Sequence, residues 1–299
     1  MRIAVPRVGF PFTAPTQPGG VEVLPDEPAY GVHYDTGYAR RQPARMARVL
    51  FVEGPLRVAV QGLAAPTRAG LDRLTDLRGP AIFAGNHHSH LDAPILLTSI
   101  PEPWRHRLVI GAAADYFFGN WLTSAASALA LGAVPFERTR VNRRSADQLA
   151  ELIADRWSVV IFPEGGRSPD GWGQGHRGIA AYLASRCDVP VVPVHIRGTD
   201  RIYAKGDRRP RPGVTTVTFG HPILPVEGEN TTRLAARIEA AVATLADEAA
   251  TDWWGARQRA AAGTTPPLTG PSTTSWRRAW ALGDRRGRRR SSATRWPSI

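Results

Sequence analysis

Short apolar runs alternate with helical patterns through the middle of this 299-residue chain. Five runs are mostly β-branched and bounded by Gly, Pro or polar residues: 81–84, 108–110, 159–162, 191–194 and 215–219. Helical spacing of apolar residues occurs between and after them, at 93–100, 120–130, 144–156, 176–186 and 231–249. Buried strands that alternate with helices are typical of α/β folds. The sequence therefore predicts one α/β domain over about 65–250, with a mostly parallel mixed sheet flanked by helices.

Two segments precede the predicted domain. Residues 1–37 are rich in Pro and Gly and are expected to form an irregular N-terminal extension. Residues 38–64 mix Arg with apolar side chains around Gly54 and Pro55, which favours one or two amphipathic helices. Such helices suit two roles, docking on the core of the domain or anchoring to a membrane surface.

A basic, Arg- and Trp-rich tail, 251–299, follows the domain and is expected to be largely disordered. Residues 252–299 hold ten Arg and two acidic residues, so they carry +8 of the net charge of +12. The stretch 263–274 is rich in Pro, Gly, Ser and Thr and is expected to be irregular. The tail is either a solvated extension or, because Trp is interleaved with Arg, a surface for anionic lipid headgroups. No nucleic-acid partner is expected, because no basic fold motif accompanies the tail.

The first group of candidate catalytic residues is Asn86-His87-His88-Ser89-His90-Leu91-Asp92, directly after the run 81–84. We expect His87 at the end of a strand and Asp92 at the start of the next helix. A carboxylate that folds back onto an imidazole fixes its tautomer and makes the ring a general base. The alternative is a zinc-dependent hydrolase that uses His88, His90 and Asp92.

Two further loops follow predicted strands. In Phe162-Pro163-Glu164-Gly165-Gly166-Arg167-Ser168, the glycines let backbone N–H groups approach an anion, and Arg167 offers a forked donor to phosphate. Glu164 is expected to accept hydrogen bonds from a ligand hydroxyl or to orient an Arg. The segment 132–138 is a strand that ends in Arg138. Within 191–194, Pro193 predicts an edge strand or a bulge.

Taken in order, these blocks resemble the glycerolipid acyltransferase family, whose best-known members are 1-acylglycerol-3-phosphate acyltransferases. Asn86, His87 and Asp92 match the family motif Asn-His-x4-Asp, and 132–138 resembles its second block. Phe162–Ser168 matches Phe-Pro-Glu-Gly-Thr-Arg-Ser with Gly166 in place of Thr, and Val192-Pro193-Val194 matches the fourth motif. The resemblance covers about 68–222.

The resemblance implies an O-acyltransferase that needs no cofactor, with acyl-CoA or acyl-carrier protein as co-substrate. It implies that His87 and Asp92 are catalytic and transfer an acyl group to a lysophospholipid such as 1-acylglycerol-3-phosphate, giving phosphatidic acid. Substrate-binding roles are implied for Arg138, Glu164, Gly165 and Arg167. Residues 116–133 either line an acyl-chain groove or form an ordinary core helix.

The expected location is peripheral, on the cytoplasmic side of the cell membrane and in contact with membrane lipid. No signal peptide is predicted, because the apolar run near the N-terminus is broken by prolines. No transmembrane helix is predicted, because no stretch has 18 uninterrupted apolar residues.

Overall fold

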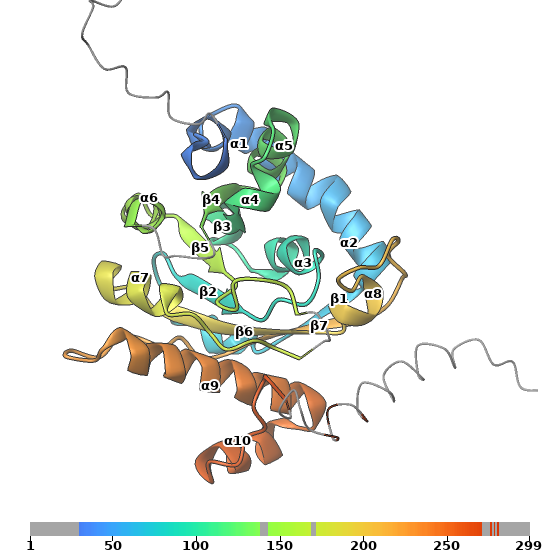
Figure 1. Ribbon diagram of the computed structural model, residues 1–299, viewed down its shortest axis with the longest axis vertical. Coiled ribbons are helices and arrows are strands. Elements are labelled where there is room, and N and C mark those ends of the chain that lie inside the picture. The colour runs from blue at the N-terminus through green and yellow to red at the C-terminus, as the bar shows by residue number, and fades with distance from the viewer. Residues whose placement is uncertain are drawn as a thin grey trace, which may run out of the picture.

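The computed structural model describes residues 30–137, 143–168 and 172–270, together with 276, 278 and 280. Within these residues seven strands form one sheet in the order β1-β7-β6-β2-β5-β3-β4 (Figure 1). Five neighbouring strands are parallel: β6 (Val191–Arg197), β2 (Ile82–Gly85), β5 (Ser158–Ile161), β3 (Leu108–Ala113) and β4 (Ala133–Phe136). β7 (Thr215–Phe219) is antiparallel to β6, and β1 (Pro66–Ala69) is parallel to β7. The predicted α/β fold class is confirmed.

Helices cover both faces of the sheet (Figure 1). One face carries α3 (Asp92–Ser99) beneath α1 (Ala44–Phe51) and α2 (Arg57–Ala64). α4 (Ala114–Phe117) and α5 (Trp121–Leu131) lie on the same side, where α5 contacts both α1 and α3. The other face carries α6 (Arg143–Ala154), α7 (Ile179–Cys187) and α9 (Thr231–Ala250). Side chains that alternate along β2 divide between the two cores, with Phe83 in the first and Ile82 and Ala84 in the second.

The N-terminal helices have one buried face and one exposed face. A π-helical turn, η3 (Val52–Leu56), joins α1 to α2 at Pro55, which lacks the N–H that a regular α-helix uses. Val52 and Val60 are buried in the core, whereas Leu50 and Val58 are more than 70% exposed. One face of the helices therefore docks on the domain, as one of the two predicted roles requires. The opposite face is left apolar and exposed.

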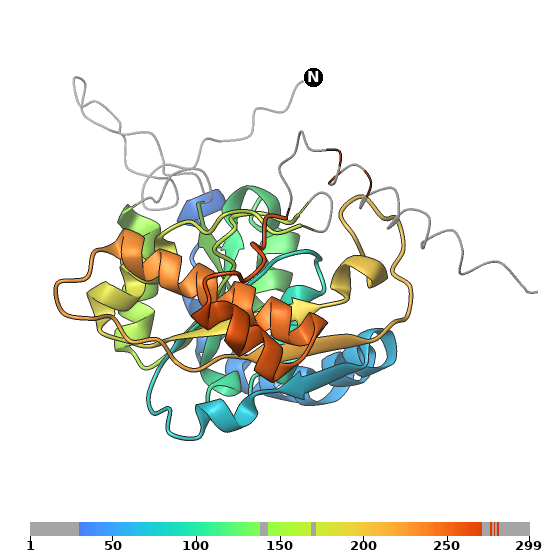
Figure 2. The ribbon, with the colours of Figure 1, turned by 90° about the horizontal axis from the view of Figure 1, so that it is seen from below.

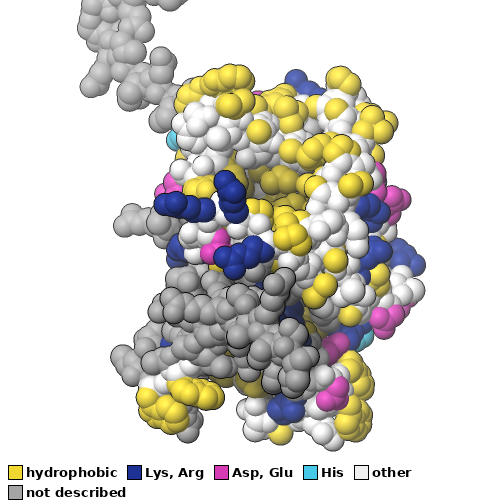
Figure 3. Space-filling model, turned by 90° about the vertical axis from the view of Figure 1, so that its right-hand side faces the viewer, with side chains coloured by type: hydrophobic (Ala, Val, Ile, Leu, Met, Phe, Trp, Pro, Cys, Tyr) yellow, Lys and Arg dark blue, Asp and Glu magenta, His cyan; other side chains and the backbone are white. Residues whose placement is uncertain are grey.

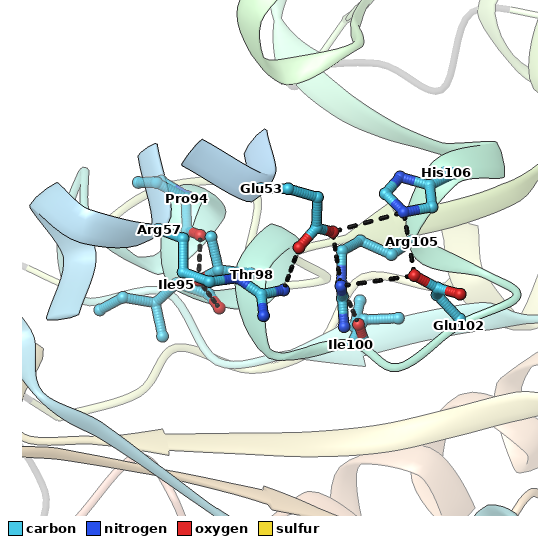
Figure 4. A network of polar contacts seen from close by, with 9 residues as sticks. All are labelled: Glu53, Arg57, Pro94, Ile95, Thr98, Ile100, Glu102, Arg105 and His106. Atoms are coloured by element: carbon cyan, nitrogen blue, oxygen red, sulfur yellow. Dashed lines mark hydrogen bonds and ion pairs between the residues drawn. The ribbon is translucent and has the colours of Figure 1, made fainter. Parts of the chain in front are cut away.

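A polar network fixes this turn to the end of α3 (Figure 4). Arg105, in η5 (Arg105–Arg107), contacts Glu53 at 2.6 Å through Nη1 and donates through Nε to the carbonyl of Ile100 at 2.8 Å. His106 lies 3.3 Å from Glu53 and 3.2 Å from Glu102. Because the Arg105 cation already occupies Glu53, these two carboxylates and His106 are best explained as an ion-pair network.

Pro193 lies in a central strand, since β6 has β2 on one side and β7 on the other. The expected irregularity is nevertheless present. Pro193 accepts from the Gly220 N–H at 2.8 Å, just beyond the last strand pair, Val194 with Phe219. Pairing resumes at Val191 with Ile223, one residue out of register. Between these pairs, Val192 and Pro193 face the three residues 220–222, so the proline lies opposite a bulge, where its missing N–H breaks no regular ladder.

Two short elements near the chain ends differ from the expectation. β1 has almost no apolar signature, because Thr67, Arg68 and Ala69 are exposed, and it is held at the edge by β7. Trp253–Ala261 form α10 in the tail that the composition predicts as irregular. Asp252 caps α10 by accepting from the Gly255 N–H at 2.8 Å. Residues 1–29 of the predicted extension, and most of the tail beyond 270, lie outside the described residues.

Over the part of the chain that the structure describes, none of the helices has both the length and the apolar character to cross a membrane.

The helix after β5 and its loop, α7, begins later than the sequence predicted. The pattern at 176–186 becomes α7 at Ile179, and residues 172–178 form an extended loop. Two short elements pack in the core on the other face, with α2 and α3: η4 (Leu71–Leu74) before β2, and α8 (Thr199–Ile202) after β6. Before α1, Gly31–His33 and Gly37–Arg40 are single 3-10 turns.

Candidate active site

His87 and Asp92 meet beyond the end of β2, as predicted. The chain leaves the strand at Gly85, and α3 begins at Asp92, so the carboxylate folds back beneath the imidazole. His87 Nδ1 lies 2.9 Å from Asp92 Oδ2. Asp92 is fully buried, and the His87 side chain is 19% exposed. When Nδ1–H donates to the carboxylate, Nε2 becomes the acceptor at the open side of the ring.

The environment of Asp92 stabilises its ionised form. Burial alone would raise the pKa of this carboxyl, but His87, the Thr199 hydroxyl and the Ser89 N–H together bring the pKa below its ordinary value. Oδ2 also accepts from the backbone N–H groups of His88 and Ser89, at 2.7 and 2.8 Å. A buried carboxylate with these partners is a fixed acceptor for the His87 ring.

The loop after β5 packs against His87. The Phe162 ring stacks on the imidazole, with centroids 4.3 Å apart and planes inclined by 19°. The backbone of His87 is held on both sides, because its N–H donates to Glu164 Oε1 at 3.0 Å and its carbonyl accepts from Ser168 N–H at 2.9 Å. The ring therefore has little freedom to leave the dyad geometry.

Glu164 lies beneath this loop. It is 1% exposed, and its second oxygen, Oε2, accepts from the Gln174 N–H at 2.9 Å. Burial, helped by the nearby Asp92 and Glu239 carboxylates, raises the pKa of Glu164 to about 7, against the two backbone donors. The expectation that Glu164 contacts a ligand is not supported by this placement. Glu164 instead joins the loop at Gln174 to the backbone of His87.

Asn86, the first residue of the motif, has a structural role. Its amide donates to the carbonyl of Ile196 at 2.9 Å and accepts from the Ile196 N–H at 2.7 Å. The side chain thereby continues the pairing of β2 with β6 by one residue beyond Gly85. This extension fixes the point at which the chain turns toward His87.

A cavity of about 390 Å³ opens beside the dyad. His87 and Phe162 line it together with apolar side chains from β3, α5, β4, α6 and α7, including Ile110, Leu131, Phe136, Leu149 and Ile179. Tyr116 and Phe117 also line it, whereas Trp121 and Leu122 point to solvent, 66% and 61% exposed. Part of the segment 116–133 therefore faces the cavity and part is buried in the core, while its exposed side chains fit neither predicted role.

Polar groups line one part of this cavity. Gly165, Gly166, Arg167 and Arg177 contribute to its wall. Gly165 has φ +71, and a Cβ there would lie 2.9 Å from the guanidinium carbon of Arg177, so only glycine lets Arg177 pack this closely. Two guanidinium groups beside an imidazole make a suitable site for a phosphorylated hydroxyl compound.

His90 takes part in an aromatic cluster at the cavity. Its ring stacks on Tyr116 with centroids 5.2 Å apart, and Nε2 lies 3.1 Å from the Tyr116 hydroxyl. Burial, with the charges of Arg167 and His87, lowers the pKa of His90 to about 4, so the ring is neutral. Among the described residues, the His, Cys, Asp and Glu side chains close enough to share a metal are Glu53, Glu102 and His106. This arrangement gives the zinc alternative no support.

The structure therefore brings His87, Asp92, Gly165 and Arg167 to one cavity and places Glu164 below it. Arg138 lies outside the described residues. Sequence reasoning missed Arg177 as a cavity residue. Arg177 stands directly before Gly178 and α7, but a single Arg before a helix is too common to mark a site.

Comparisons with known proteins agree with this geometry. The family model described as acyltransferase matches residues 57–197, which include the dyad and the Gly-rich loop. Residues 57–197 are therefore similar to the acyltransferase family. The matched region also includes β6 with its bulge at Pro193.

Several enzymes named 1-acyl-sn-glycerol-3-phosphate acyltransferase are similar in sequence to this chain. The chloroplast 1-acyl-sn-glycerol-3-phosphate acyltransferase of Brassica napus is 32% identical over 46% of this chain and 38% of its own length. The human 1-acyl-sn-glycerol-3-phosphate acyltransferase alpha is 29% identical over 58% of this chain and 61% of its own. The matched region thus spans less than two thirds of either relative.

A solved structure has the same fold as the acyltransferase domain. The 1-acyl-sn-glycerophosphate acyltransferase of Thermotoga maritima superposes with a TM-score of 0.53 at 21% identity. The superposition covers 75% of this chain and 83% of that one. The likeness supports the arrangement of the sheet and its helices around the cavity.

Proposed function

We propose that the protein moves a fatty acyl group from the thioester of acyl-CoA or acyl-carrier protein to the free hydroxyl of 1-acylglycerol-3-phosphate, giving phosphatidic acid. The observation that carries this proposal is the His87–Asp92 dyad at an apolar cavity that also holds Arg167 and Arg177. The shared name of the similar enzymes supports the choice of acceptor.

In the proposed reaction, His87 Nε2 accepts the proton of the acceptor hydroxyl as the oxygen attacks the thioester carbonyl carbon. Asp92 stabilises the imidazolium that forms. The tetrahedral intermediate then collapses, the carbon–sulfur bond breaks, and the ring returns its proton to the leaving thiolate. Direct transfer needs no acyl-enzyme, so Ser89 is free for its structural contact, donating to the carbonyl of Tyr203 at 2.7 Å.

The substrates fit different parts of the cavity. The phosphate of the acceptor is assigned to Arg167 and Arg177, with the backbone of Gly165 and Gly166 close to it. A fatty acyl chain is assigned to the apolar wall formed by Ile110, Leu131 and Leu149. Arg138 is proposed as a further acceptor contact on the strength of the motif alone.

We further propose a peripheral position on the membrane, at its cytoplasmic side. Apolar side chains on α1 and α5 are exposed and form what we call the apolar surface: Met46, Leu50, Trp121, Leu122 and Leu129. Figure 3 shows hydrophobic side chains gathered around a hollow in the upper half of the molecule, the half that holds α1 and α5 in Figure 1. A membrane-bound acceptor makes such a surface useful beside the cavity.

The test of the reaction is the release of free thiol from acyl-CoA in the presence of lysophosphatidate. We expect His87→Ala and Asp92→Asn to lower turnover by about a thousandfold, because each removes the proton acceptor or its fixed partner. The exposed His221 provides the control, and His221→Ala is expected to keep full turnover. Most of the activity surviving in either dyad variant would exclude His87 as the base.

The same assay tests the zinc alternative. Turnover is expected to be unchanged after treatment with a chelator, and purified protein is expected to hold no stoichiometric zinc. Loss of activity on chelation, with recovery on adding zinc, would contradict the proposed mechanism.

A further inference from the structure

The chain after α10 returns to the candidate active site. Residues 262–270, which we call the C-terminal strap, lie beside the loop between β5 and α7 (Figure 2). The Gly173 N–H donates to the carbonyl of Leu268 at 2.9 Å. Gly270 has φ +66, and a Cβ at this position would lie 2.4 Å from the indole ring of Trp172. The strap therefore contacts the loop through a backbone hydrogen bond and through close ring packing.

The start of the strap is fixed to the body of the domain. Arg259 in α10 contacts Asp247 of α9 with two hydrogen bonds, of 2.6 and 3.1 Å, and also donates to the Thr251 hydroxyl at 2.7 Å. Asp247 is buried, and Ala256 is fully buried between the helices. α10 is thus a firm support from which the strap reaches the loop.

The loop that the strap contacts is the one that holds Glu164. Gln174, next to Gly173, donates its N–H to Glu164 Oε2 at 2.9 Å, and Glu164 Oε1 accepts from the His87 N–H at 3.0 Å. A short path of hydrogen bonds therefore runs from Leu268 through the loop and Glu164 to the backbone of His87. No side chain of the strap is in the cavity lining, so its effect on chemistry is indirect.

The charge state of Glu164 depends on this path. Burial raises its pKa to about 7, Asp92 in α3 and Glu239 in α9 act in the same direction, and the Gln174 and His87 N–H groups oppose them. Loss of the Gln174 donor while Glu164 stays buried raises the pKa further. Glu164 then becomes an ionised carboxylate, the form that accepts most strongly from backbone N–H groups, only at higher pH.

We infer that the C-terminal strap is a positioning element for His87, which it holds in place through Gly173, Gln174 and Glu164. This inference rests on the proposed function, in which His87 is the base. The strap lies outside the acyltransferase motifs, and this inference gives it the role of supporting the first motif, at His87.

Two glycines of the strap region provide a matched pair of variants in the full-length protein. Gly270 and Gly263 have nearly the same backbone conformation, with φ +66 and +67. A Cβ at Gly270 meets Trp172, whereas a Cβ at Gly263 has no atom within 4 Å. Gly270→Ala and Gly263→Ala therefore carry similar backbone strain, and only the first pushes the strap away from the loop.

Hydrogen exchange is the readout that does not depend on activity. In Gly270→Ala we expect several-fold faster exchange in peptides spanning 172–178 and 86–92, with unchanged exchange in β7 and an unchanged thermal transition. In turnover assays we expect kcat to fall by about tenfold at constant KM for acyl-CoA. The acidic limb of kcat against pH is expected to move to higher pH, as the pKa of Glu164 rises. Gly263→Ala is expected to match the wild type in all of these measurements.

Equal behaviour of the two variants would mean that backbone strain and not the Trp172 contact is responsible, and would overturn the inference. Faster exchange at 172–178 without any change at 86–92 would overturn it as well. If the wild-type protein releases no thiol from acyl-CoA, the proposed function fails, while the exchange data still decide whether the strap holds the backbone of His87.

Discussion

At the scale of single residues, two buried carboxylates support His87 in different ways. Asp92 contacts the imidazole, and its pKa is held below the ordinary range by partners that favour the charged form. Glu164 contacts the backbone of His87 and not its ring, and burial raises the pKa of Glu164 to about 7. One acid thus orients the ring, and the other holds the chain that carries it.

The raised pKa of Glu164 predicts a particular dependence of stability on pH. The folded state binds this proton up to about pH 7, whereas the unfolded chain releases it near the ordinary value of 4.5. The contribution of Glu164 to the free energy of unfolding therefore declines as pH rises from 4.5 to 7, by about 3 kcal/mol.

Urea unfolding at several pH values tests this dependence. Glu164→Gln cannot ionise, so we expect the difference between wild type and variant to change across this window and to stay constant above it. A constant difference from pH 4.5 to pH 8 would show that the pKa of Glu164 is not raised.

At the scale of elements, the turn between α1 and α2 depends on one buried cation. Arg105 and Arg57 both contact Glu53, but the Arg105 side chain is 8% exposed and the Arg57 side chain 41%. Arg105 also satisfies the carbonyl of Ile100. The two arginines therefore form a natural comparison between a buried and an exposed ion pair.

We expect Arg105→Met to lower the free energy of unfolding by about 2 kcal/mol, because it leaves the Ile100 carbonyl without its donor and removes the buried cation from Glu53. Arg57→Met is expected to cost less than about 1 kcal/mol. Chemical denaturation of the two variants measures both values. Equal losses would contradict the assignment of Arg105 as the main tie between η3 and α3.

The sequence predicted elements well where burial leaves a strong pattern. The five β-branched runs and the stripe of Leu234, Ile238 and Val242 in α9 are buried and were recognisable. β1 was missed because its exposed residues carry no such pattern, and it is a strand only because β7 pairs with it. Local spacing also placed the start of α7 too early, since the loop at 172–178 is set by its contacts to Glu164 and Leu268.

The same distinction applies to the site. The contact between His87 and Asp92 was predictable because the two residues are only five positions apart and one turn joins them. The structural role of Glu164 could not be predicted, because it depends on the contact with Gln174 and on burial, and no sequence motif encodes either of them. Arg177 and the strap reach the site through tertiary contacts, which are invisible in local sequence.

At the scale of the whole molecule, the apolar surface on α1 and α5 lies at the opposite end of the molecule from α9 (Figure 1). Leu50 is 71% exposed, and Leu224, in the segment before α9, is 59% exposed. If the apolar surface binds membrane, only the first of these leucines should matter. The two positions thus offer a matched test of the proposed peripheral location.

We expect Leu50→Glu to lower binding to vesicles that contain anionic lipid by about tenfold, because a charge then opposes burial in the interface. Leu224→Glu is expected to bind like the wild type. Vesicle flotation measures the binding, and turnover on dispersed substrate confirms that both variants are folded. Equal binding by all three proteins would assign attachment to another part of the chain.

The edge strand β1 has a consequence for how the chain is made. Its one neighbour in the sheet is β7, and the Thr67 hydroxyl contacts Thr215 at a separation of 148 residues. A ribosome needs roughly 7 to 30 s to add that length. During this interval the N-terminal helices and β1 have left the ribosome while the strand that completes the sheet does not yet exist. Newly made chains therefore depend on protection of this N-terminal surface until residue 219 has emerged.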